Sequence, residues 1–143
     1  KVFELQSWML KLLIDSEYHY LIVDAIDTRY YSFSEDVIEE SDGLYAKCAS
    51  EGLTKLICYM LAHKVVPCDF DKNHACTYAA TSGHLDCLHL LRSAKFEWDT
   101  NTTHEAYVNE NIACLLYLLE NGCPWQSING KSREDIIKLY TLT

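Results

Sequence analysis

The sequence has little of several residues and patterns that mark other classes of protein. Only 5 glycines and 2 prolines occur among 143 residues, too few for a collagen-like chain, a flexible linker or a turn-rich β-sandwich. The longest apolar runs, such as 115–119, are far shorter than the ~20 residues that cross a bilayer. The chain does not open with a basic segment followed by an apolar one. We therefore expect neither a membrane protein nor a secreted one.

Positive charge is also scarce. The formal net charge is −9, and residues 1–42 hold ten carboxylates against Lys1, Lys11 and Arg29. A surface for nucleic acid or anionic lipid needs clustered basic side chains to neutralise phosphates, and the sequence contains no such cluster. We therefore expect no nucleic acid and no membrane as partner. A solvated acidic face is the simpler interpretation of the charge, and a basic protein partner is the alternative.

Cysteine is plentiful, but it does not form the patterns of a disulfide framework or a metal site. The cysteines number seven, an odd count, and most lie in apolar, helix-like runs where cysteine acts as a small buried hydrophobe. No C-x-x-C occurs, and neither His74–Cys76 nor His84–Cys87 has the second pair that zinc needs. We expect free thiols, no metal or other cofactor, and a reducing, intracellular compartment, either cytoplasm or a virion.

The sequence contains none of the motifs that assemble a catalytic centre. The run NGKS at 129–132 resembles the end of a phosphate-binding loop, but Trp125 stands where the first glycine is required. Neither G-x-S-x-G nor H-E-x-x-H occurs. Adjacent carboxylates such as Glu39 and Glu40 point apart on a helix. We predict that the protein is not an enzyme and takes no small-molecule substrate.

The chain repeats itself. Residues 78–99 align with 105–126 at an offset of 27 and, in the other direction, their first part aligns with 47–61 at an offset of 31. In the second alignment Phe70 takes the aromatic position. The pairs in the first are Ala79–Ala106, Leu85–Ile112, Cys87–Cys114, Leu88–Leu115, Leu91–Leu118 and Trp98–Trp125. Such self-similarity predicts a repeat protein.

Each unit is predicted to be a pair of short helices. The first helix, such as HACTYAATS, is rich in small residues and ends at Gly83, where a left-handed residue stops a helix. The second helix, HLDCLHLLRSA, places Leu85, Leu88 and Leu91 on one face. Because neither helix can bury its apolar face alone, the units must stack.

The run HACTYAATSGHLDCLHLL at 74–91 resembles the ankyrin signature T-P-L-H-x-A-A-x-x-G-H-x-x-V-x-x-L-L. The run NGKSREDII at 129–137 is similar to the start of a capping ankyrin unit. The short period and the phrase LLENGCPW resemble the divergent ankyrin repeats common in giant DNA viruses of amoebae. The resemblance covers about 43–140. It implies an all-α, ankyrin-like solenoid of stacked helix-turn-helix repeats with an N-terminal helical cap.

Two features depart from the ankyrin pattern. The T-P-L-H turn is missing at 74–77, and the third unit has Glu110 at the position of the glycine. We expect Asn109 or Asn111 to adopt the left-handed conformation there, because asparagine tolerates it better than glutamate.

The repeats are expected to fill residues 42–143. Their boundaries are placed at about 43–73, 74–103 and 104–130, with a capping unit at 131–143. Residues 1–41 do not align with them, and there we expect an amphipathic helix from about 3 to 14, a second around 17–28, and then a loop with a helical turn. A cap or degenerate repeat is the simpler interpretation of this segment, and an independent interaction motif is the alternative.

The resemblance implies a protein-binding scaffold or adaptor, and its likeness to viral repeats implies a host protein as the partner. Its partner contacts would lie on the concave face, at equivalent positions of successive first helices. These positions are Lys47, Ser50, Tyr78, Thr81, Glu105 and Val108. Tyr78 is the strongest candidate, because aromatic side chains anchor interfaces at low entropic cost. Simple exposure to water is the alternative for these residues, and a structural role in a virion or larger assembly is the alternative function.

Overall fold

The protein is mostly helical, as the sequence predicts. The computed structural model describes residues 3–16 and 31–142, which form nine helices and two short strands. The strands are β1 (Phe3–Leu5) and β2 (Tyr31–Phe33). The helices are α1 (Ser7–Asp15), α3 (Glu35–Glu39), α4 (Leu44–Glu51), α5 (Thr54–Ala62), α6 (Asp69–Ser82), α7 (Leu85–Ser93), α8 (Thr100–Val108), α9 (Ile112–Glu120) and α10 (Arg133–Thr141). Among the described residues, no helix is both long and apolar enough to cross a bilayer.

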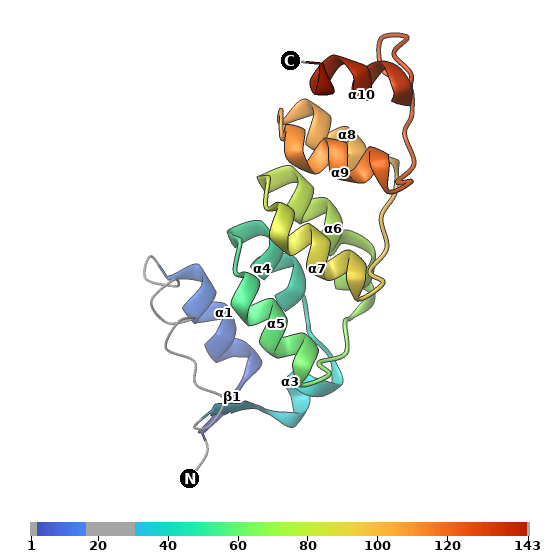
Figure 1. The fold of residues 1–143 in the computed structure, drawn as a ribbon. Coiled ribbons are helices and arrows are strands. Elements are labelled where there is room, and N and C mark those ends of the chain that lie inside the picture. Colours follow the sequence, from blue (N-terminus) through green and yellow to red (C-terminus); the bar gives the residue numbers. More distant parts are fainter. Residues whose placement is uncertain (1–2, 17–30, 143) are drawn as a thin grey trace.

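The helices from α4 onward form successive pairs that stack along one direction. Figure 1 shows α4–α5, α6–α7 and α8–α9 following one another, with α10 beyond α9 and α1 beside α4 at the other end. The first helices of the pairs, α4, α6 and α8, form one layer, and the second helices form another. Each pair therefore contacts its neighbours through like helices.

The first-helix layer packs through small side chains. Ala49 of α4, Ala75 and Ala79 of α6, and Ala106 of α8 are all completely buried. The helices that carry them contact one another in order, α4 with α6 and α6 with α8. Because alanine adds little more than a methyl group to the backbone, it allows neighbouring helices to approach closely.

Aligned positions of the second helices have the same environment. Three sets of residues, one from each of α5, α7 and α9, are at most 1 % exposed. The sets are Leu56, Cys87 and Cys114; Ile57, Leu88 and Leu115; and Met60, Leu91 and Leu118. These core positions inferred from the repeat alignment are thus confirmed, whereas the aligned Leu85 and Ile112 are only partly buried.

The turns inside the first two pairs lie against the pair that follows, Gly52 beside His84 and Gly83 beside Asn111. Gly83 follows α6 with φ +78°, which confirms the left-handed residue predicted there. The side chain of Asn111, from the next pair, donates hydrogen bonds to the carbonyl oxygens of Ala80 and Thr81 at 2.7 and 2.9 Å. A Cβ atom at Gly83 would lie 2.7 Å from Oδ1 of Asn111. Glycine is therefore favoured at position 83 by its positive φ and by this close approach, which leaves little room for a Cβ atom.

The expectation that an asparagine replaces the glycine of the third unit was wrong. Glu110 itself has φ +57°, whereas Asn109 and Asn111 have φ −87° and −83°. The turn geometry explains this result. The backbone N–H of Asn111 donates a hydrogen bond of 2.9 Å to the carbonyl oxygen of Ala106, and the backbone N–H of His84, at the aligned position, donates the same kind of bond to Ala79. The hydrogen-bonding register, and not residue type, decides which residue becomes left-handed.

The N-terminal segment differs from the expected helix over 3–14. Residues 3–5 form β1, which pairs in parallel with β2, and α1 begins only at Ser7. Leu5 pairs with Phe33, and both side chains are buried. Helical periodicity could not reveal this strand, since its partner lies far along the chain and within the expected loop. The helix expected around 17–28 lies outside the described residues.

The expected unit boundaries at 73/74 and 103/104 fall inside α6 and α8. Helix α6 starts at Asp69, and Cys68 is its N-cap: the Cys68 side chain accepts a hydrogen bond from the backbone N–H of Asp71. Helix α8 starts at Thr100, after an Asp99–Thr102 capping box. The boundaries were placed where the small-residue pattern begins, whereas the N-caps lie several residues before it. As a consequence, Phe70 belongs to the first turn of α6 and does not occupy the aromatic loop position.

Gly83→Ala is expected to lower the free energy of unfolding by roughly 1–3 kcal/mol, because alanine is strained at positive φ and its Cβ would clash with Asn111. Gly122→Ala is the matched control: Gly122 has φ +81° but no atom within 4 Å of the added Cβ. Urea denaturation of both variants separates backbone strain from the clash. Equal losses in the two variants would show that the contact with Asn111 is unimportant.

Leu88→Ala should destabilise the protein by about 2–5 kcal/mol, because it opens a cavity in a completely buried position of the stack. Leu142, which is 80 % exposed, provides the control, and Leu142→Ala should stay within about 0.5 kcal/mol of the wild type. Thermal and chemical denaturation measure both. A Leu88→Ala protein as stable as wild type would contradict the core assignment.

Candidate functional site

Two adjoining hollows lie over α4, α6 and α8, and between them they are lined by five of the six predicted binding residues. The first, about 370 Å³, is bounded by α1, α4 and α6 and is lined by Lys47, Ser50 and Tyr78 among others. The second, about 450 Å³, lies over α6 and α8 and is lined by Tyr78, Thr81 and Glu105 among others. Tyr78 therefore lies between the two hollows.

Val108, the sixth predicted residue, lines neither of these hollows. It follows the aligned spacing of Ser50 and Thr81, and its side chain is 58 % exposed at the end of α8. The structure thus gathers five of the six residues around two connected hollows and leaves Val108 at the margin.

The sequence analysis missed two residues of this surface, Phe70 and His74. Both line the second hollow, and Phe70 also lines the first. The ring centroid of Phe70 lies 5.0 Å from that of His74 and 5.9 Å from that of Tyr78. The spacing of four residues places all three rings on one side of α6. This spacing is the sequence signal for the two residues, and it applies only because the helix begins at Asp69.

We call the exposed surface formed by Lys47, Ser50, Glu51, Phe70, His74, Tyr78, Thr81, Glu105 and Val108 the first-helix face. At its centre lie Phe70 and Tyr78, whose side chains are 48 % and 40 % exposed. Large aromatic side chains left open to solvent beside a hollow are typical of binding surfaces.

Buried polar contacts hold α6 in place beneath these rings. Asp71, next to Phe70, is completely buried; its carboxylate accepts hydrogen bonds from the Ser41 hydroxyl and, at 2.9 Å, from the backbone N–H of Ala46. Thr77, next to Tyr78, shares a 2.8 Å hydroxyl–hydroxyl hydrogen bond with Thr102 of α8. These bonds fix α6 between α4 and α8, so the aromatic rings stand on a rigid base.

Charged groups surround the first hollow. Lys11 and Lys47 pair with Asp42 and Asp15, each at 2.5 Å, and all four side chains are at least one-third exposed. Such exposed pairs add little stability. Glu51 also lines this hollow. In the part of the chain that the structure describes, no basic side chain pairs with Glu51.

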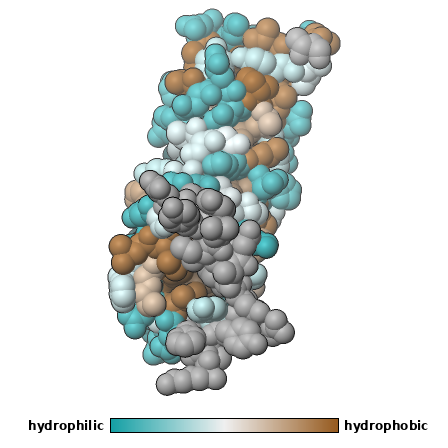
Figure 2. All heavy atoms as spheres, turned by 90° about the vertical axis from the view of Figure 1, so that its left-hand side faces the viewer, coloured by the Kyte–Doolittle hydropathy of each residue, from teal (hydrophilic) through white to brown (hydrophobic). Residues whose placement is uncertain are grey.

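The exposed apolar groups of α1 are a separate feature. Trp8 and Leu12 are 60 % and 63 % exposed. Figure 2, which looks at the left-hand side of Figure 1, shows hydrophobic atoms gathered at the level of α1, while hydrophilic and hydrophobic atoms are interspersed above. Part of this hydrophobic surface lies at the N-terminal end of the stack.

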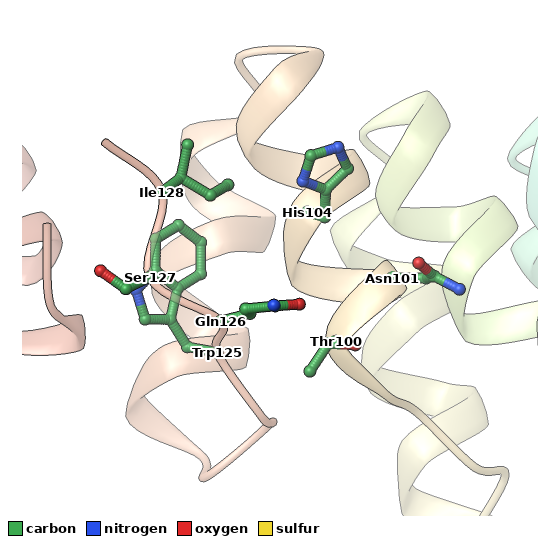
Figure 3. A pocket seen from close by; sticks show the side chains of 7 residues that line it. All are labelled: Thr100, Asn101, His104, Trp125, Gln126, Ser127 and Ile128. Carbon is green, nitrogen blue, oxygen red and sulfur yellow. The ribbon is translucent and has the colours of Figure 1, made fainter. Parts of the chain in front are cut away.

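A further hollow of about 320 Å³ lies between α8 and the segment that follows α9. Figure 3 shows His104 of α8 lying opposite Trp125 and Ile128. Among the described residues that line it, His104 is the only ionisable side chain, and the others include the hydroxyls of Thr100 and Ser127.

All seven cysteines lie within the described residues, and all are unpaired thiols. Five are buried, whereas Cys58 is exposed and Cys68 is partly exposed. Burial raises the pKa of Cys76 and Cys123 to about 12 and that of Cys114 to about 11. Over residues 3–16 and 31–142, no group of three or more His, Cys, Asp or Glu side chains is arranged to hold a metal ion.

Comparisons with known proteins give no match: neither a family model, nor a curated protein, nor a solved structure matches this sequence. The resemblance to ankyrin repeats therefore depends on the motif at 74–91 and on the repeat spacing.

The free energy of unfolding should fall as the pH rises above 9. Thiols ionise with an ordinary pKa of 9.0 in the unfolded chain, whereas the folded protein keeps Cys76 protonated until about pH 12. The unfolded state therefore loses protons first, and alkaline pH favours it. Urea denaturation under reducing conditions, at neutral pH and at several pH values above 9, measures this change.

Two variants separate the contribution of the buried thiols to this pH dependence from that of other groups that titrate at alkaline pH. Cys76→Ala should reduce the slope of stability against pH, because it removes a buried thiol. Leu142→Ala, at an exposed position without an ionisable group, is the control and should leave the slope unchanged. Identical slopes in wild type and Cys76→Ala would contradict the protonation of Cys76 as a source of stability.

Proposed function

We propose that this chain is an ankyrin-like solenoid that binds another protein across the first-helix face, without catalysis. The observation that carries the proposal is the row of exposed rings on α6, from Phe70 through His74 to Tyr78, which lies between two hollows. Aromatic anchors flanked by concave surface are typical of protein interfaces.

The stacked arrangement supports the same function. Each helix pair contributes equivalent outward positions, Lys47, Tyr78 and Glu105, so that the face extends along the stack. Repeat proteins use such extended surfaces to bind partners, because their cores need only the inward positions. The outward positions are then free to vary in chemistry.

The proposal also assigns the protein to a reducing, intracellular compartment. Its support is that seven cysteines remain unpaired in a chain of this size, since an oxidising compartment favours disulfides. The viral origin suggested by the resemblance stays a prediction.

The test is affinity capture of partners from cell lysate, followed by binding measurements with the purified partner. Tyr78→Ala and Phe70→Ala should each weaken binding by at least about five-fold if the rings are interface anchors. Both variants should melt within a few degrees of the wild type, because both side chains are largely exposed. Leu139→Ala, at a 47 % exposed position of α10, is the control and should bind as wild type.

Two results would contradict the proposal. A Tyr78→Ala protein as unstable as Leu88→Ala would show that Tyr78 belongs to the core. A partner that Tyr78→Ala and Phe70→Ala bind unchanged, and that Leu139→Ala fails to bind, would place the interface at α10.

A further inference from the structure

We infer that the partner segment bound on the first-helix face is cationic, with an arginine or lysine side chain stacked on Tyr78 and Phe70 between Glu51 and Glu105. This inference rests on the proposed function, because it names the chemistry of the partner for the same surface. The supporting observations are the charge of the two hollows, the exposed aromatic rings, and the acidity of the whole chain.

The lining of the two hollows is acidic. Among the described residues, the two hollows are lined by the carboxylates of Asp15, Asp42, Glu51 and Glu105, by two lysines and by His74. Both lysines are already paired, with Asp15 and Asp42. Glu51 and Glu105 are left without a basic partner among the described residues. Their charges are therefore available to an incoming cation.

The positions of these two glutamates direct a cation to the rings. Glu51 lines the first hollow and Glu105 the second, while Tyr78 and Phe70 line both. A cation above the rings would thus lie between two carboxylates. The side chain of Glu105 is held by a hydrogen bond of 3.3 Å from Asn109, which orders the carboxylate without neutralising it.

Aromatic faces attract cations through the negative charge of their π-electrons, most strongly when water is partly excluded. The same chain already contains such a pair: the guanidinium carbon of Arg92 lies 4.0 Å from the ring centroid of Trp98. On the first-helix face, Phe70 and Tyr78 are 48 % and 40 % exposed. His74 lies beside Phe70, with ring centroids 5.0 Å apart, and no described lysine or arginine forms a cation–π pair with either ring. An arginine of the partner would complete this pair.

The charge of the whole protein acts in the same direction. A net charge of −9 attracts basic segments and repels acidic or phosphate-bearing ones over about a Debye length. Complementary charge of this kind raises association rates and selects partners more than it raises affinity.

The first experiment uses a library of random peptides displayed on phage and selected on the purified protein. Selection is repeated on Tyr78→Ala and on the double variant Glu51→Gln/Glu105→Gln. We expect peptides that depend on Tyr78, carry a net positive charge, and contain at least one arginine or lysine. The double variant should fail to enrich these peptides.

The second experiment measures the affinity of a selected peptide as a function of salt concentration. Glu51→Gln and Glu105→Gln should each weaken binding by about two- to five-fold at low salt, with a smaller effect at high salt. Glu120→Gln is the matched control, because Glu120 is an exposed glutamate at the end of α9 in the other layer, and it should bind as wild type.

The outcomes separate this inference from the proposed function. Peptides that require Tyr78 but are apolar or acidic, and that tolerate Glu51→Gln/Glu105→Gln, would overturn the cationic partner and leave the binding face in place. Absence of any peptide that requires Tyr78 would overturn both. A salt-independent affinity of a cationic peptide would also contradict the role given to the carboxylates.

Discussion

The close packing of α4 on α6 and of α6 on α8 is the constraint on which the rest of the structure depends. Completely buried alanines, such as Ala49, Ala79 and Ala106, leave room for the backbones of these helices to approach. A larger side chain at any of these positions would separate two neighbouring pairs. The second helices of the same pairs would then also move apart and lose leucine contacts, because each pair contacts its neighbours through both of its helices.

Tight packing on the inner side leaves the outer side of the same helices free. The residues beside the buried ones on α6, namely Phe70 and Tyr78, face solvent, while Asp71 and Thr77 bond the neighbouring helices. Adjacent residues of α6 thus have different roles: those that point to the neighbouring helices stabilise the stack, and those that point to solvent form its surface. This separation allows a stack of helices to carry an acidic and aromatic surface without weakening its core.

Sequence comparison within the chain predicted the core of the second helices well and the helix starts poorly. The offset of 27 residues correctly equated Leu88 with Leu115, because both fill the same space between stacked pairs. The start of α6 was predicted too late, because the N-cap of that helix, Cys68, is not a typical capping residue. The displaced start hid Phe70 and His74 from the predicted site, although Tyr78 was placed correctly on the exposed side.

The sequence by itself determined the helical class, the repeat, the buried positions of each pair and the exposure of Tyr78, because periodicity and self-similarity record which side of a helix meets a neighbour. Only the tertiary structure decided the features that join distant residues. The pairing of β1 with β2, the contact of Asn111 with the turn at Gly83, and the placement of Glu51 and Glu105 in the two hollows that Tyr78 also lines all depend on how one element is placed against another. No local pattern encodes such a placement, since it results from the packing of the whole stack.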